Sequence, residues 1–366
     1  MTPPPELMDD LVGEILLRLP PDEPEHLFRA ALVSKPWLRL LCAAAFRRRY
    51  RAFHGAPPLL GLLHKCQVLE GDPAPCFAST TSLPLPDFPH PSSDGRRTRP
   101  LDCRHGHVLV HMLEEDPTMG LLPDIDWLIY SAAVFCAADG CDHLDCHGGP
   151  FRVVFVATHD YKDTPSVPNY KSFQESWRVK SEAYVQHMRD GNAVVRPRYY
   201  TSYLQPRRGT LVGDAIYFTI RVDNTIIKYE WDQNCLSMIK PPTQNTYYIA
   251  LMAMEDGSLG FSCIEGSSLY LWSRKVNSEG AAEWVQCKVI ELETIIPGSN
   301  DLAIVVGFAE GVGVIFISTG VGLFTIELKS GRVRKVDKLE VYFSVLPYMS
   351  FYTPDRGRLL SLAWTH

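Results

Sequence analysis

The sequence predicts an α+β protein of two domains: a short helical domain over residues 1–55 and an all-β domain over residues 56–366. Before about residue 55, apolar residues recur at the three- and four-residue spacing of amphipathic helices. After it, short apolar runs are separated by Gly, Pro, Asp and Asn, which is typical of strands and turns. A third observation is that a turn followed by apolar strands recurs in the carboxyl-terminal half.

Three helices are expected in the first domain. The first runs from about residue 6 to residue 19. Its apolar stripe consists of Leu7, Leu11, Val12, Ile15, Leu16 and Leu19. Pro20 and Pro21 end this helix, because proline lacks the amide donor that the helix needs. Asp22 is the expected N-cap of the second helix, and Ser34 is the expected N-cap of a third helix that extends to Gly55.

In the β domain, the recurring turns begin at Asp214, Asp256 and Glu310. They are 42 and 54 residues apart, and Gly106 lies 108 residues before the first of them. Blades of four short strands repeat at about 40–50 residues. Radial repetition also leaves few exposed strand edges. The spacing therefore predicts a kelch-like β-propeller, and a β-sandwich is the alternative.

Composition and charge narrow the class of protein. The net charge of −6 disfavours nucleic-acid binding, because proteins that bind nucleic acids concentrate positive charge. The amino terminus has no secretory-signal pattern, and the uncharged run between Glu310 and Glu327 is shorter than the roughly 20 residues of a membrane helix. Ten cysteines without a signal indicate reduced thiols. We therefore expect no nucleic-acid partner, no membrane association, and localisation in the cytoplasm and/or nucleus.

Cys136, Cys141, Cys146 and His147, with His143 between them, form the sharpest metal-like cluster. Zinc needs four such ligands in a tetrahedron. The four-residue gaps between the cysteines are wider than the shortest knuckle turns, and a solvated turn that carries thiols is the alternative. We therefore assign no metal ligand and expect no cofactor.

Other polar groups are expected to be structural. Cys103, His105 and His107 form a weaker group of strand and loop residues, and Arg207 and Arg208 are expected to be ordinary loop charges. We find no phosphate-binding loop, nucleophile elbow or zinc-protease pair, so no catalytic residue is assigned. Because any two of the scattered carboxylates could meet in the fold, a propeller hydrolase remains an alternative.

Residues 5–50 carry the most specific pattern. A helix, a proline break and a second helix are followed by Leu32-Val33-Ser34-Lys35-Pro36-Trp37. Together with the stretch from Leu7 to Pro20, this segment resembles an F-box. Its pairing with a long β-rich region resembles the F-box proteins abundant in grasses. Met8 departs from the family pattern, which usually has proline at that position.

This resemblance implies that the chain is the substrate-recognition subunit of a Skp–cullin–F-box ubiquitin ligase. The helical domain would bind a Skp-type adaptor and, through it, a cullin, while the β domain would bind an unknown target protein. Such a subunit is not an enzyme, since it acts by holding the target near a charged ubiquitin carrier. The matched adaptor-binding positions are Leu7, Met8, Leu11, Ile15, Leu16, Leu19, Pro20, Leu32, Val33, Ser34, Lys35 and Trp37.

The residues alone also favour a partner, though less specifically. Some fifty residues in three helices bury too little surface for a stable separate domain. The segment nevertheless carries more large apolar residues than one small core can hide, so a helix-in-groove partner is expected. The alternative is that this face packs on the β domain.

Two alternative functions remain: a propeller enzyme, either hydrolase or oxidase, and an adaptor-binding protein without a ligase role.

Overall fold

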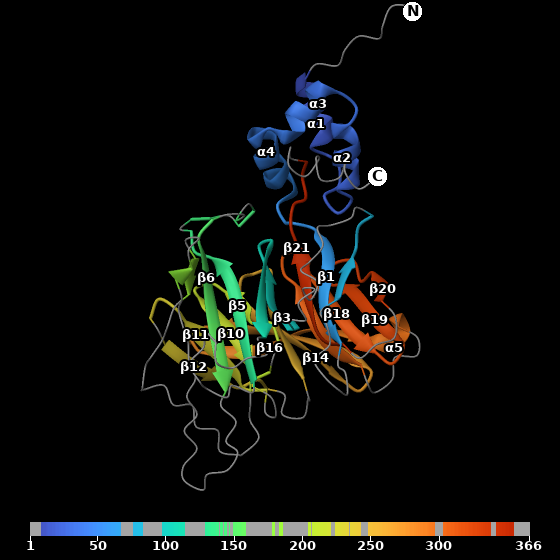
Figure 1. The fold of residues 1–366 in the computed structure, drawn as a ribbon. Coiled ribbons are helices and arrows are strands. Elements are labelled where there is room, and N and C mark those ends of the chain that lie inside the picture. The colour runs from blue at the N-terminus through green and yellow to red at the C-terminus, as the bar shows by residue number, and fades with distance from the viewer. Residues whose placement is uncertain are drawn as a thin grey trace, which may run out of the picture.

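The structure is a computed structural model of the 366-residue chain. The described residues are 9–66, 76–82, 97–113, 129–138, 140, 141, 143, 144, 146, 149–158, 178–179, 183–185, 204–205, 207–220, 224–233, 235–242, 248–296, 303–337 and 342–354. Figure 1 shows the amino-terminal helices gathered at one end of the molecule, with the strands arranged in a broad β domain beside them.

The amino-terminal region folds into four helices, α1 (Asp9–Leu16), α2 (Glu25–Ala31), α3 (Lys35–Cys42) and α4 (Ala44–His54). The expected third helix is therefore two helices. Ala43 between them has extended backbone angles (φ −68°, ψ 132°). This break lets Leu41 of α3 and Phe46 of α4 enter the same core.

Of the two N-caps predicted from the sequence, one is confirmed and one is wrong. Ser34 caps α3 as expected, because its Oγ accepts a hydrogen bond from the Trp37 amide at 3.4 Å. The prediction that Asp22 caps the second helix is wrong. Pro24 occupies the N-cap position of α2 with φ −62°, and no side chain bonds to the helix end. Proline fixes φ near the helical value, so it starts the helix without a side-chain cap.

One core holds the helices together. Its buried members are Val12, Leu16, Leu17, Leu27, Ala30, Ala31, Leu41, Phe46, Tyr50 and Phe351. The hydroxyl of Tyr50 donates a hydrogen bond to the carbonyl oxygen of Leu19 at 2.8 Å. Burial and the nearby Asp22 carboxylate raise the pKa of Tyr50, so its hydroxyl stays protonated and keeps this donor role.

The described strands form six sheets. The first sheet holds β1 (Leu59–Cys66), β2 (Cys76–Ser79) and β21 (Tyr342–Met349), and the second holds β3 (Arg97–Arg104) and β4 (His107–Leu113). The third holds β5 (Ile129–Cys136), β6 (Phe151–Thr158), β7 (Arg178–Val179) and β8 (Ala183–Val185).

Three further four-stranded sheets lie in the carboxyl-terminal half. They are β9 (Thr210–Val212) to β12 (Cys235–Ile239), β13 (Ile249–Ala253) to β16 (Ala282–Glu291), and β17 (Ile304–Ala309) to β20 (Val333–Asp337). The strands between these are β10 (Ala215–Thr219), β11 (Ile226–Glu230), β14 (Leu259–Glu265), β15 (Ser268–Val276), β18 (Val314–Thr319) and β19 (Gly322–Glu327). A short helix, α5 (Leu292–Ile295), follows β16.

The sheets have a propeller-like arrangement, with four sheets of four strands each. Each carboxyl-terminal sheet is an antiparallel meander, and its first strand faces the neighbouring sheet: β9 lies beside β13, and β13 beside β17. The same ring continues from β17 to β21, from β21 to β3, and from β3 to β5. This arrangement supports the propeller prediction over the β-sandwich.

The two ends of the β domain meet in one sheet. Strand β1 pairs antiparallel with β21 over the register from Leu59↔Met349 to Cys66↔Tyr342. Strands β17 and β21 also approach closely, since a Cβ added at Gly307 would lie 2.5 Å from the carbonyl oxygen of Val345. The ring is therefore closed by strands from opposite ends of the domain, which removes an open sheet edge.

The helical region is attached to the β domain by two segments of chain. The first joins His54 at the end of α4 to Leu59 at the start of β1. The second follows β21, where Phe351 enters the helical core and Tyr352 stacks on Phe28 with ring centroids 5.4 Å apart. Within the described residues, no helix has both the length and the apolar character needed to cross a membrane.

Candidate functional site

Helix α1 has apolar side chains on two faces. Val12 and Leu16 point into the helical core and are each 3% exposed. Leu11 and Ile15, four residues apart and therefore on one face, remain 46% and 54% exposed. Adjacent exposed apolar side chains on one helix face mark a candidate contact surface.

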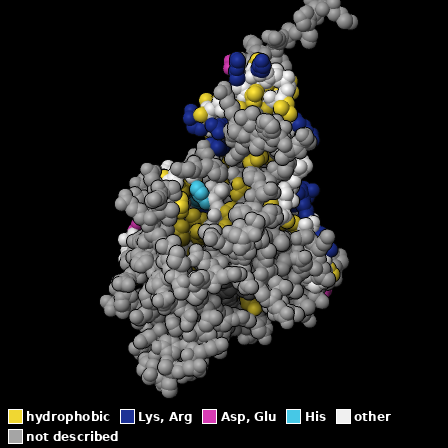
Figure 2. Space-filling model, viewed as in Figure 1, with side chains coloured by type: hydrophobic (Ala, Val, Ile, Leu, Met, Phe, Trp, Pro, Cys, Tyr) yellow, Lys and Arg dark blue, Asp and Glu magenta, His cyan; other side chains and the backbone are white. Residues whose placement is uncertain are grey.

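A second pair of exposed apolar residues lies where α2 ends. Leu32 is 78% exposed and Val33 is 64% exposed. We call Leu11, Ile15, Leu32 and Val33 the outer apolar residues. Figure 2 shows hydrophobic side chains at the surface of the helical region, interspersed with basic residues. The described part of the β domain leaves these four side chains accessible, so the alternative that they pack on the sheets is not supported.

The other sequence-predicted site residues take different positions. Leu16 lies in the core, so it supports the outer surface of α1 from beneath. Leu19 and Trp37 are partly buried against the same core. Pro20 and Lys35 are exposed. Leu7 and Met8 lie outside the described residues.

Ser34 has a structural role that can be measured separately. Replacing Ser34 by alanine removes the hydrogen bond that the Trp37 amide donates, and we expect the helical region to lose about 1 kcal/mol of stability. Ser34→Asp, which keeps an acceptor at the N-cap, is expected to retain most of it. Thermal unfolding of the two variants, monitored by circular dichroism, checks this prediction. If both variants lose the same stability, the cap contributes nothing.

A second candidate region lies where the inner strands of the β domain meet. Asp102, at the end of β3, is completely buried. Its Oδ1 accepts hydrogen bonds from the Cys103 amide and from Arg208 Nε, both at 2.8 Å. Its Oδ2 accepts from the Val134 amide of β5 at 2.8 Å. Arg104 Nη1 lies 3.6 Å from the same oxygen. This carboxylate thus connects three segments far apart in the sequence.

Glu310 completes this network. Its Oε2 lies 3.3 Å from Arg208 Nη2 and 3.4 Å from Arg104 Nε. The two carboxylates therefore balance the two guanidinium groups. Burial alone would lower the pKa of Arg208, but Glu310 and Asp102 outweigh burial and raise it. The expectation that Arg208 is an ordinary loop charge is wrong, because partners on β3 and after β17 make its burial possible.

Arg207 is also buried, contrary to the same expectation. It is 8% exposed, its Nη1 donates to the Val305 carbonyl oxygen at 3.0 Å, and its guanidinium lies 4.9 Å from the centre of the Tyr248 ring. Burial lowers its pKa to about 10. At pH 7 the group therefore remains charged.

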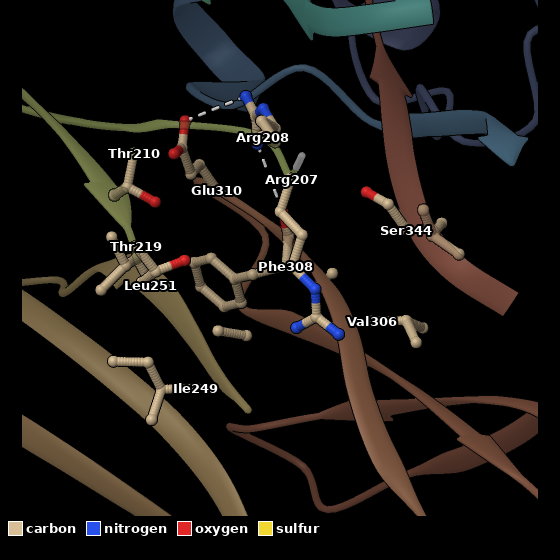
Figure 3. Close-up of a pocket in the computed structure, with 13 residues that line it drawn as sticks. Arg207, Arg208, Thr210, Thr219, Ile249, Leu251, Val306, Phe308, Glu310 and Ser344 are labelled. Carbon is tan, nitrogen blue, oxygen red and sulfur yellow. Dashed lines mark hydrogen bonds and ion pairs between the residues drawn. The ribbon is translucent and has the colours of Figure 1, made fainter. Parts of the chain in front are cut away.

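These arginines line a small cavity among the inner strands. Figure 3 shows Arg208 beside Glu310 and Arg207 near Val306, with Thr210 and Ser344 also lining the cavity. The free volume is about 30 Å³, room for about one water molecule. The carboxylate in its wall is already paired with arginine. This cavity therefore gives no support to the propeller-enzyme alternative, which needs room for a substrate and an available acid or base.

A larger hollow of about 370 Å³ lies between the last two four-stranded sheets. Met252, Met254 and Phe308 contribute its apolar lining. Lys275 and Asp256 lie on its rim, 3.6 Å apart. Its size is that of a small ligand pocket. No group in it marks a particular chemistry.

The cysteine cluster is brought together in the loop between β5 and β6. Cys136, Cys141, His143 and Cys146 each place a ligand atom within 4.8 Å of the others. His143 takes the histidine position, and His147 lies outside the described residues. No disulfide joins any two of the eight cysteines whose side chains are described.

The fold and these sites define a class of protein: a propeller-like β domain that carries an amino-terminal helical region with accessible apolar side chains. No protein-family model matches the chain, and no curated protein matches it in sequence. Two solved structures resemble part of it; both are of an extracellular domain from B. thetaiotaomicron, described as a one-component and a hybrid two-component system. They share 13% and 12% identity, with TM-scores of 0.24 and 0.25. The matches cover 51% of this chain but only 26% of each of theirs.

Proposed function

We propose that this chain is the substrate-recognition subunit of a Skp–cullin–F-box ubiquitin ligase. In this proposal, residues 1–55 are an F-box that binds a Skp-type adaptor. The propeller-like domain, kelch-like in the finer assignment, binds a target protein. The chain performs no chemistry itself and works in the cytoplasm or nucleus, where the ligase operates. The observation that carries the proposal is the exposure of Leu11 and Ile15 on α1, in a segment whose sequence resembles an F-box.

The energetics of the outer apolar residues support a protein partner. Burying one large apolar side chain contributes about 1.5–3 kcal/mol. Leu11, Ile15, Leu32 and Val33 are between 46% and 78% exposed, so a partner that covers any of them gains this contribution. Leu11 and Ile15 lie on the short helix α1, and Leu32 and Val33 lie in the turn between α2 and α3. A short amphipathic helix of this kind fits the groove of a helical partner.

The arrangement of the two regions also suits a receptor. The helical region lies at one end of the molecule, so an adaptor bound there would leave much of the β domain open to a target (Figure 1). Two segments attach the helical region to the β domain, through His54–Leu59 and through Phe351. A firm attachment is what a receptor needs to hold its target at a fixed distance from the ubiquitin carrier.

The double variant Leu11→Asp, Ile15→Asp tests adaptor binding. We expect its affinity for a purified Skp-type adaptor to fall at least about 100-fold, because two apolar contacts are lost and two carboxylates would lose water in the complex. Calorimetry or surface plasmon resonance with the full chain measures the affinity. Both side chains are about half exposed, so the fold should tolerate the change.

The matched control is Val276→Asp, Val289→Asp, which places two charges at exposed apolar positions of β15 and β16. This control should bind the adaptor as the unchanged chain does. Leu16 is unsuitable for the test, because a charge at a residue only 3% exposed would unfold the helical core. Equal adaptor affinity in the α1 double variant and the control would refute the assignment.

Ubiquitin transfer separates a ligase subunit from an adaptor-binding protein without a ligase role. The chain is captured from tissue with the proteasome inhibited, and co-purified proteins are assayed for ubiquitination with and without added cullin. Cullin-dependent modification that the α1 double variant lacks is the expected result. Adaptor binding without any cullin recruitment would favour the second role.

A further inference from the structure

The loop between β5 and β6 has the geometry of a four-ligand metal site. The sulfur atoms of Cys141 and Cys146 are 3.6 Å apart, and Cys146 Sγ is 3.6 Å from His143 Nδ1. Zn–S bonds of about 2.3 Å and Zn–N bonds of about 2.0–2.1 Å give tetrahedral edges of about 3.8 Å between two sulfurs and about 3.6 Å between sulfur and nitrogen. With Cys136, all four ligand atoms lie within 4.8 Å of one another.

We propose that Cys136, Cys141, His143 and Cys146 bind a structural Zn²⁺ ion. A tetrahedral set of thiolate and imidazole ligands suits zinc and disfavours the hard cations Mg²⁺, Ca²⁺ and Mn²⁺, which prefer oxygen ligands. Four protein ligands leave no open position for a substrate, so the site is structural and not catalytic.

The backbone around the cysteines supports thiolate ligands. The amide of Ala138 donates to Cys136 Sγ at 3.4 Å, and the amide of His143 donates to Cys141 Sγ at 3.4 Å. In both cases the donor lies two residues after the cysteine. Amide hydrogen bonds of this kind stabilise a negatively charged sulfur and fix its orientation, as outer-shell donors do in metal sites.

The chain adopts unusual backbone angles in order to bring the ligands together. Gly140 has φ +64°, and His143 has φ +59°, in the left-handed region that residues other than glycine seldom adopt. For a residue other than glycine such a conformation is kept only where the surroundings hold it. A bound ion that fixes the side chain of His143 would supply that constraint.

Neighbouring elements brace the loop. The His143 ring stacks on His105 with centroids 4.4 Å apart and planes 2° apart. Nε2 of His107 lies 3.0 Å from the Cys146 carbonyl oxygen. Leu144, between two of the ligands, packs against the helical core. The site therefore connects β5, the β3–β4 turn and the helical region. Zinc would fix the loop where the two regions of the protein meet.

Metal analysis of the purified full-length chain tests this inference directly. After incubation with ZnCl₂ under reducing conditions and removal of loosely bound metal, we expect about one zinc ion per chain by mass spectrometry. With Co²⁺ in place of zinc, we expect the visible absorption of a tetrahedral, thiolate-bound ion. This measurement uses the unchanged protein, so it does not depend on whether any variant folds.

Ligand variants then assign the residues. Cys141→Ser, Cys146→Ser and His143→Asn should each lose at least about nine-tenths of the zinc; asparagine tolerates the left-handed backbone at position 143. Cys235→Ser and Cys287→Ser, at exposed cysteines elsewhere, should keep it. Zinc absent from the reduced unchanged chain, or equal zinc in ligand and control variants, would overturn the proposal. A Cys141–Cys146 disulfide with no zinc retained after reduction would overturn it as well.

Discussion

Replacing Asp102 by asparagine is expected to destabilise the β domain by about 3–5 kcal/mol. The side chain keeps its size but loses its charge. Among the described residues, Glu310 would then be the one carboxylate left beside Arg104 and Arg208, which are both largely buried. Asparagine would also present an N–H group to neighbours that are themselves donors, so at least one of the three hydrogen bonds to this carboxylate would be lost.

Thermal unfolding of the full chain, followed by the circular dichroism of its strands, measures this effect. Asp256→Asn is the matched control, because Asp256 is exposed and its ion pair with Lys275 is on the surface. Adding Arg208→Leu to Asp102→Asn should recover part of the loss, since it removes one of the unmatched charges. A midpoint for Asp102→Asn as high as that of the control would show that the network contributes little.

Replacing Phe351 by alanine is expected to cost about 3–5 kcal/mol, the usual loss for a fully buried phenylalanine. Phe351 is 3% exposed and meets the Tyr50 ring edge-on, with centroids 6.1 Å apart. It reaches the helical core from the end of β21. The variant should therefore both destabilise the helices and loosen their attachment to the sheets.

Limited proteolysis and thermal unfolding together measure this result. Faster cleavage between the helical region and the β domain is expected for Phe351→Ala, along with an earlier loss of helical signal. Phe53→Ala is the matched control, because Phe53 is on α4 but is 56% exposed, and it should change stability by less than about 0.5 kcal/mol. Identical behaviour of the two variants would mean that the carboxyl-terminal segment does not hold the helical region.

Much of the local structure could be predicted. Ser34 caps α3 as predicted, because capping depends on a few adjacent residues. The first helix was expected to reach residue 19, just before Pro20 and Pro21, but α1 ends at Leu16. The strands predicted after Asp214, Asp256 and Glu310 match the outer three strands of each carboxyl-terminal sheet. The first strand of each sheet, β9, β13 and β17, was missed. Each of these strands was missed because it lies before the turn that marks the repeat in the sequence.

The candidate sites could be predicted only in part. The sequence indicated a metal-like cluster of Cys136, Cys141, Cys146 and His147 with His143 between them, and the structure brings His143 to the cysteines, while His147 lies outside the described residues. Spacing along the chain does not decide whether a turn directs His143 toward the cysteines. The stripe on α1 was predicted as one face, whereas Leu11 and Leu16 lie on opposite sides of the helix. Only the position of the surrounding helices decides which side is covered.

The sequence by itself determined the change from helices to strands near residue 55, the Ser34 cap of α3 and the hairpins of the carboxyl-terminal half, because these depend on periodicity and turn chemistry within a few residues. The tertiary structure alone decided the closure of β1 on β21 and the burial of Asp102 with Arg208. Each of these joins residues more than a hundred positions apart. Such contacts form only when the whole ring of sheets is assembled, and no sequence pattern within a few residues predicts them.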